Sequence, residues 1–281
     1  MRKRNPNKDY DYSSLPTTRK ESFKDVYRHN FKTIFSCGVM LLLFAIPLIA
    51  FLIVMNFGRL GMNTNTYSEE VLPSVLLVWD LILNAGIIVL LYVFLIGLMG
   101  VMRVLKLLVW QEGINFGHDF KVGIKENFKQ MTIFYWIGAL IYAATYSVYI
   151  FLLAFVIGLS LLLLFTIMFV PLIFWCFYTI NVYQTTFINY LKNGIFFYSR
   201  SIGWTLLFVV MAIWPFFMIF IPMDGYFFLI KYPVLILLIL FYYPFLLIIG
   251  YLYSLDKFDQ YINKENYPEI YRRGLYDINK R

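Results

Sequence analysis

Long apolar stretches alternate with short charged segments along the chain. Thr33–Phe57 contains no charged residue, and Leu76–Met102 contains only Asp80. From Met131 to Leu191, 61 consecutive residues include no Asp, Glu, Lys or Arg. Because a helix needs about 20 residues to cross the hydrocarbon core of a bilayer, the first two stretches predict one crossing each. The third stretch is long enough for two crossings.

This pattern predicts an all-α polytopic membrane protein with six transmembrane helices. A tight hairpin near Gly158–Ser160 would separate the third and fourth helices. We place the spans at Thr33–Phe57, Leu76–Met102, 132–156, 161–183, Ile202–Ile221 and Pro233–Leu255. The polar remainder divides the chain into a basic, partly disordered N-terminal tail (1–30), a transmembrane domain (31–255) and a C-terminal tail (256–281).

Composition supports lipid as the solvent of this chain. Hydrophobic residues make up 61% of the 281 residues and charged residues 14%, against roughly 45–50% and about 25% in soluble domains. A water-soluble protein of this length has no single core large enough to bury so much apolar surface. The composition therefore indicates an integral membrane protein.

The distribution of basic residues predicts the orientation. Of the 24 Lys and Arg residues, all but Arg59 and Lys231 fall on one side of the predicted topology. That side holds both tails and the two connectors, Gly97–Met131 and Gln184–Ser201. Basic segments stay in the cytoplasm, so both termini are predicted to be cytoplasmic. Topology and anionic headgroups also explain the net charge of +8 without a nucleic-acid partner.

The first connector contains an amphipathic segment, Asp119–Met131. Aromatic or aliphatic residues and lysines both recur there at four-residue spacing, which is typical of a helix lying in the membrane interface with its lysines directed to anionic headgroups. The alternative is a docking surface for a partner protein. The residues concerned are Phe120, Lys121, Ile124, Lys125, Phe128 and Lys129.

Asp80 and Asn84 form the candidate polar site within the spans. Their spacing places both on one face of the second predicted helix. An ionisable residue within a span is costly and often marks an ion or solute site. Asp80 also lies about one turn from the outer boundary, where its carboxylate can reach water or headgroups. The sequence leaves both interpretations open.

Catalytic and metal-binding patterns are missing from the sequence. His29 and His118 lie in polar segments without a metal-ligand motif, and Cys37 and Cys176 lie in apolar stretches. Glycine-rich phosphate-binding loops and nucleophile-elbow motifs are also missing. We therefore expect no enzymatic activity, no cofactor and no metal.

Several short segments resemble the YesL-like family of bacterial integral membrane proteins. They are the end of the second span at Gly97–Arg103, Glu112, the segment GIKENFKQ at Gly123–Gln130, Tyr190–Leu207 and Tyr267–Leu275. The resemblance covers roughly residues 30–275 and implies a location in the bacterial cytoplasmic membrane. It brings no catalytic residues, because that family has no established activity, but its genes often lie beside carbohydrate uptake systems.

These observations predict a non-enzymatic accessory protein. Its cytoplasmic segments would bind a membrane transport system or another membrane protein, and the resemblance implies a link to carbohydrate transport. The alternative is a small-solute transporter or channel that uses the helix bundle itself, with Asp80 and Asn84 in its polar path. The bilayer is the expected partner in either case.

Overall fold

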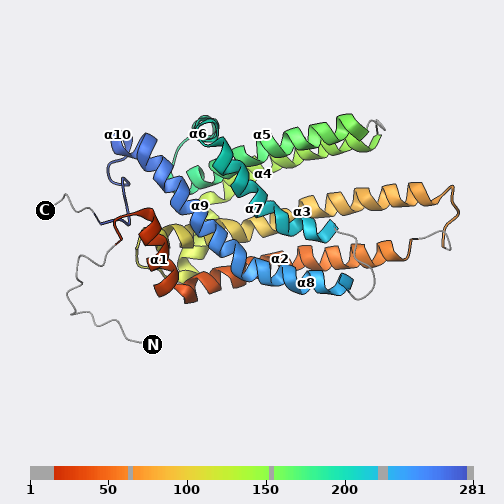
Figure 1. Cartoon of the computed structure of the whole chain (residues 1–281), viewed down its shortest axis with the longest axis horizontal. Coiled ribbons are helices and arrows are strands. Elements are labelled where there is room, and N and C mark those ends of the chain that lie inside the picture. Colours follow the sequence, from red (N-terminus) through yellow and green to blue (C-terminus); the bar gives the residue numbers. More distant parts are fainter. Residues whose placement is uncertain (1–15, 63–65, 152–154, 221–226, 277–281) are drawn as a thin grey trace.

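A computed structural model describes residues 16–62, 66–151, 155–220 and 227–276 of the chain (Figure 1). Every regular element within these residues is a helix. The disorder predicted for the start of the N-terminal tail, through Pro16, falls on residues that lie outside the described part except for Pro16 itself. The α-helices are α1 (Arg19–His29), α2 (Phe31–Leu60), α3 (Leu72–Val109), α4 (Phe116–Phe151), α5 (Phe155–Val182), α6 (Phe187–Arg200), α7 (Ile202–Phe220), α8 (Phe227–Leu237), α9 (Tyr243–Phe258) and α10 (Lys264–Asn266). Two π-helical segments, η2 (Leu238–Tyr242) and η3 (Asp259–Asn263), join α8, α9 and α10.

Five helical segments are long and apolar enough to cross a membrane. They are α2, α3, most of α4, most of α5, and the continuous segment Ile230–Asn266 that runs from α8 to α10. A sixth crossing is formed if α6 and α7 count as one span, since these helices meet at Ser201 with a bend of 103°. The chain is thus an all-α polytopic membrane protein, as predicted, with five or six spans.

The predicted hairpin at Gly158–Ser160 is wrong. These residues lie inside α5, whereas α4 ends at Phe151 and α5 begins at Phe155. Gly158 instead allows the two helices to approach, because a Cβ atom there would lie 2.4 Å from the Cα atom of Tyr149 in α4. Small residues in membrane helices commonly serve such contacts.

The helices share one long axis, and the connecting segments separate into two groups along it (Figure 1). Helices α1, α6 and α10 and the connector between α3 and α4 lie at one end, which we call the connector end. The turn from α2 to α3 and the start of α8 lie at the other end. The two connectors predicted to share one side of the membrane are thus found together. That this side is the cytoplasm remains a prediction from the charge count.

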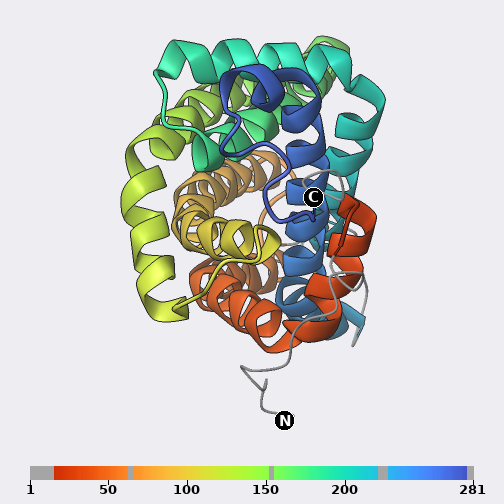
Figure 2. The same cartoon turned by 90° about the vertical axis from the view of Figure 1, so that its left-hand side faces the viewer.

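The predicted interfacial helix is the first part of a longer helix. Asp119–Met131 belongs to α4, which continues without interruption for 36 residues. Figure 2, a view along the long axis, shows the yellow-green first turns of α4 running across the end of the bundle before the helix curves into its span. Helix α6 also crosses this end.

Aromatic packing fixes the helices that meet at the connector end. The indole of Trp175 in α5 is fully buried and stacks on Phe197 of α6, with ring centroids 5.0 Å apart. Phe197 in turn contacts Phe258 at the end of α9, 4.9 Å away. The Trp175 indole N–H donates to the Thr205 hydroxyl in α7 at 3.0 Å, so its one polar atom is satisfied. This cluster holds the end of α5 in a defined position.

Candidate functional site

Asp80 is paired with a basic residue at the end opposite the connectors. Its carboxylate lies 2.9 Å from the guanidinium of Arg59, and the two side chains are 33% and 51% exposed. The Asn84 side-chain amide donates to the backbone carbonyl of Asp80 at 2.8 Å and accepts from the Tyr142 hydroxyl at 2.7 Å. The two predicted site residues therefore lie together, but the Asp80 carboxylate pairs with Arg59 whereas the Asn84 side chain accepts from Tyr142. A partly exposed ion pair near a helix end favours the interpretation of Asp80 as an interfacial residue.

The amphipathic segment of α4 divides into a buried and an exposed part. Phe120 is 6% exposed and packs on Gly100 of α3 and on the ring of Phe44. Ile124 is half-buried against the core, whereas Phe128 is 43% exposed. Phe120 is thus part of the core and unavailable to a partner, which corrects its place in the predicted docking surface. The exposed face consists of Phe128, Lys121, Lys125 and Lys129.

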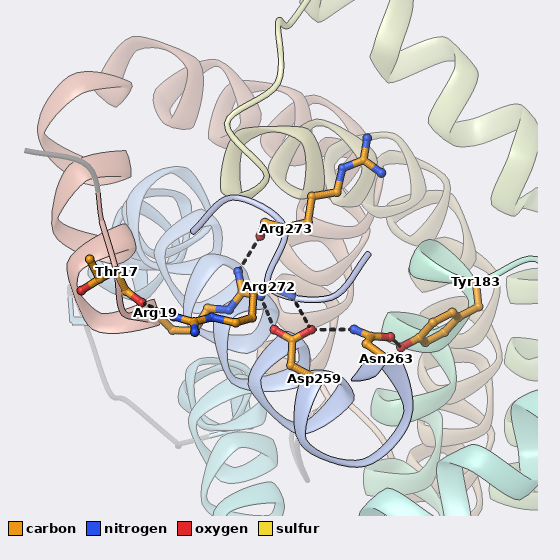
Figure 3. Close-up of polar contacts among 7 residues, drawn as sticks. All are labelled: Thr17, Arg19, Tyr183, Asp259, Asn263, Arg272 and Arg273. Carbon is orange, nitrogen blue, oxygen red and sulfur yellow. Dashed lines mark hydrogen bonds and ion pairs between the residues drawn. The ribbon is translucent and has the colours of Figure 1, made fainter. Parts of the chain in front are cut away.

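A buried carboxylate joins the two ends of the chain (Figure 3). Asp259 in η3 pairs with the Arg19 guanidinium of α1 at 2.5 Å. It also accepts from the Asn263 amide at 2.7 Å and from the backbone N–H of Arg272 at 3.1 Å. Asn263 accepts in turn from the hydroxyl of Tyr183, which follows α5. The Asp259 carboxylate therefore connects η3 directly to α1 and to the segment at Arg272, and through Asn263 to Tyr183.

Residues 16–30 and 256–276, all of them assigned to polar tails in the sequence, form a structured unit at the connector end, which we call the terminal cap. Arg273 pairs with Glu112 at 2.6 Å, and its guanidinium lies 4.4 Å from the ring centre of Trp110. The next residue, Gly274, has a φ of +82°, and a Cβ atom there would lie 2.3 Å from the carbonyl oxygen of Val109. The cap is therefore seated closely on the end of α3.

A polar cavity of about 580 Å³ lies between α3, α4 and the end of α5. We call it the α3–α5 pocket. Helices α3 and α4 contribute charged and amide side chains. The end of α5, the segment after it and the first turns of α6 contribute the rest. The residues that line it are Arg103, Lys106, Glu126, Asn127, Gln130, Ile180, Asn181, Val182, Tyr183, Gln184, Thr185 and Tyr190.

The charges of the α3–α5 pocket are unevenly matched. Arg103 and Glu126 form an ion pair across its wall. Lys106 is 8% exposed, and its ammonium donates to the backbone carbonyl of Asn181 at 2.6 Å and lies 5.1 Å from the ring centre of Trp110. Within the described part of the chain, no carboxylate lies within ion-pair distance, 4.0 Å, of the Lys106 ammonium. The pocket therefore has a surplus of positive charge.

Two amide side chains of the pocket lack hydrogen-bond partners. Asn181 is 4% exposed, and neither its side-chain oxygen nor its nitrogen has a partner among the described residues. The buried side-chain oxygen of Gln130 also has no hydrogen-bond partner among these residues. Since roughly 90% or more of buried polar groups are hydrogen-bonded, these atoms identify the pocket as the polar feature that most needs an explanation.

The sequence contains little that points to this pocket. In the sequence Lys106 is only a topology charge, Arg103 is a topology charge at the end of the resembling segment Gly97–Arg103, and Asn181 lies within the 61 uncharged residues. A lysine and an amide near the ends of two predicted spans are a weak signal. Only the packing of α3 against α4 and α5 brings these side chains together.

The described residues include no group of three or more His, Cys, Asp or Glu side chains that could hold a metal ion. Cys37 and Cys176 are both buried as free thiols in separate helices. His29 lies 2.8 Å from Asp25 on the exposed side of α1. His118 is exposed at the start of α4, 3.5 Å from Asp119.

Fold and pocket together define a class: an all-α polytopic membrane protein with a structured terminal cap and a polar pocket at its connector end. No protein-family model, curated protein or solved structure matches the chain.

Proposed function

We propose that this protein is a non-enzymatic accessory protein of the bacterial cytoplasmic membrane, with both termini in the cytoplasm. It would act by binding a membrane transport system or another membrane protein through its connector end. The likeness of the segment GIKENFKQ to YesL-like proteins supports this proposal and makes carbohydrate transport the class to test first.

The observation that carries the proposal is the exposed face of α4. Lys121, Lys125 and Lys129 are exposed at successive turns, beside Phe128, which is also exposed. An aromatic side chain among basic residues suits an acidic partner surface, because aromatic residues often anchor interfaces and complementary charges guide association.

Packing holds this face in one place. A Cβ atom on Gly100 would lie 2.5 Å from the Phe120 ring, and one on Gly123 would lie 2.7 Å from the Cβ atom of Arg103. Helices α3 and α4 are thus in close contact directly beneath the lysines. A partner would meet a preorganised surface, which lowers the entropic cost of binding.

The test is recovery of partners after mild crosslinking in cells. The double variant Lys125→Glu and Lys129→Glu is expected to reduce co-purified protein at least tenfold. The control is Lys192→Glu, an exposed lysine of α6 at the same end, which should retain the partner. A reporter fused after Arg281 must stay cytoplasmic in every variant, since basic residues also direct topology. The proposal fails if no protein co-purifies reproducibly, or if the double variant recovers the same partner.

A small-solute transporter is the second candidate, and the α3–α5 pocket favours it as a place where a polar solute could bind. It predicts solute flux in proteoliposomes. Flux that Asp80→Ala abolishes would support Asp80 as part of the path. Unchanged flux in Asp80→Ala would exclude Asp80 from the solute path and leave it a structural role in the ion pair with Arg59.

A further inference from the structure

We propose that the α3–α5 pocket binds a phosphate ester that carries free hydroxyl groups. Two sources supply this chemistry: the headgroup of a glycerol phospholipid and a soluble polyol phosphate. The inference is independent of the accessory role, since it rests on the pocket and not on the exposed face of α4. Three features of the pocket lead to it.

The first feature is the buried ammonium of Lys106. Among the described residues its one hydrogen-bond acceptor is the neutral carbonyl oxygen of Asn181, while the neighbouring Glu126 is engaged with Arg103. A buried charge without a counter-ion is strongly unfavourable, because it loses its hydration without a compensating attraction. An anion in the pocket would supply that attraction. The expected ligand therefore carries negative charge.

The second feature is the unpaired amide of Asn181. Its nitrogen can donate to an anion, and its oxygen can accept from a hydroxyl. Because neither atom has a partner within the described part of the chain, the same two hydrogen bonds can form whichever position carries the nitrogen. The unpaired side-chain oxygen of Gln130 adds a second acceptor on the α4 side. A bare anion would leave both acceptors unsatisfied, whereas an anion with hydroxyl groups would satisfy them.

The third feature is size. A cavity of about 580 Å³ lies within the range of roughly 300–1,000 Å³ that is usual for small-molecule sites. It is larger than a single inorganic anion requires. It also lies level with the ends of α3 and α5 at the connector end, where both a lipid headgroup and a soluble metabolite can arrive. A phosphate joined to a short polyol fits the volume, the charge and the amides together.

The test measures ligand binding to the full chain purified in an uncharged detergent. The probes are glycerol 3-phosphate and water-soluble dihexanoyl phosphatidylglycerol. The controls are dihexanoyl phosphatidylcholine, glycerol, and sodium chloride at matched ionic strength. Saturable binding is followed by calorimetry and by the shift in melting temperature, which a ligand of the folded state raises. We expect at least one of the two phosphate probes to bind and all three controls to fail.

Two variants connect the binding to the pocket. Lys106→Met and Asn181→Leu are each expected to raise the Kd about tenfold or more, the loss for one charge-assisted hydrogen bond. The matched control Lys192→Met changes an exposed lysine of α6 at the same end, outside both the pocket lining and the exposed face of α4, and should leave the Kd within about twofold. Asn181→Leu should also leave the melting temperature of the unliganded protein unchanged or higher, because it replaces an unpaired buried amide with an apolar group of similar size.

The pattern of binding decides between the sources and tests the proposal. Binding of the phosphatidylglycerol probe alone supports a lipid site, and binding of glycerol 3-phosphate supports a soluble ligand. The proposal is overturned if neither probe binds, or if Lys106→Met and Asn181→Leu bind as tightly as the wild type. It is also overturned if Asn181→Leu lowers the unliganded melting temperature, since the amide would then be a satisfied structural group.

Discussion

The terminal cap should open when Asp259 loses its charge. Asp259 and Arg19 are both nearly buried, with side-chain exposures of 11% and 10%. Asp259→Asn keeps the size of the side chain but leaves the Arg19 guanidinium without a counter-ion. Removing one partner of a buried pair costs about 3–5 kcal/mol. We take about 3 kcal/mol, since the Arg19 guanidinium retains its hydrogen bond to the Arg273 carbonyl at 2.9 Å.

Hydrogen exchange followed by mass spectrometry measures this loss locally. A cost of about 3 kcal/mol corresponds to a fall in protection of roughly a hundredfold. It should appear in α1 and in residues 267–276, while the amides of α2 and α3 stay protected, because the cap can open without unfolding the bundle. Asp256→Asn is the matched control, since Asp256 lies three residues earlier and is exposed. Unchanged protection of α1 in Asp259→Asn, or equal opening in the control, would refute the reasoning.

Three further predictions concern packing, charge and pH. Gly38→Ala should lower the free energy of unfolding by about 1–3 kcal/mol, measured by thermal unfolding in detergent, because a Cβ atom there would lie 1.9 Å from a backbone carbonyl oxygen of η2. The control Gly203→Ala, with open space around it, should be neutral or stabilising. Asp80→Asn should cost less than about 1 kcal/mol, because its pair with Arg59 is partly exposed, and a loss several times larger would contradict this. Hydrogen bonds from the backbone and side chain of Thr17 lower the pKa of Glu21 from its ordinary value of 4.5. The ionised Glu21 carboxylate therefore stabilises α1 fully above pH 4.5, and this stabilisation disappears as the pH falls through the lowered pKa. The difference in α1 exchange between wild type and Glu21→Gln should therefore vanish in acid, and a difference that persists there would refute it.

Hydrophobic patterning was sufficient to predict an all-α membrane protein with several spans, of which the described residues contain five, or six if α6 and α7 count as one. Transmembrane helices satisfy their backbone hydrogen bonds internally and need only length and apolarity to be stable in lipid, and both properties are visible in the sequence. The predicted fifth span, Ile202–Ile221, corresponds closely to α7, although the sharp bend to α6 was not foreseen. The hairpin at Gly158–Ser160 was misplaced because glycine and serine serve both turns and close helix contacts. In this chain Gly158 belongs to the contact between α4 and α5, whereas the exposed Ser160 donates to the Val156 carbonyl of its own helix.

The terminal cap was beyond the reach of local patterns. Arg19 and Asp259 are 240 positions apart, and each looks like an ordinary charged residue in a polar segment. Pairing depends on α9 continuing through η3 far enough to place Asp259 beside α1. Such a contact is a property of the tertiary fold. Periodicity within either segment carries no information about it.

The connector Gly97–Met131, whose charges gave the predicted topology, also shows that the charge of a residue does not reveal its position in the fold. Its five basic residues were counted alike, as cytoplasmic charges directed to headgroups or a partner. Lys121, Lys125 and Lys129 are indeed exposed, but Arg103 is held by Glu126 and Lys106 is buried. A topology signal requires only that a lysine stay on one side of the membrane, and a buried lysine at a helix end meets that requirement as well as an exposed one. Burial adds a cost that topology does not explain, and the unpaired amide of Asn181 beside Lys106 adds another. Both costs are relieved by one bound anion with hydroxyl groups, which is why the α3–α5 pocket, and not the partly exposed Asp80, is the place to look for a ligand.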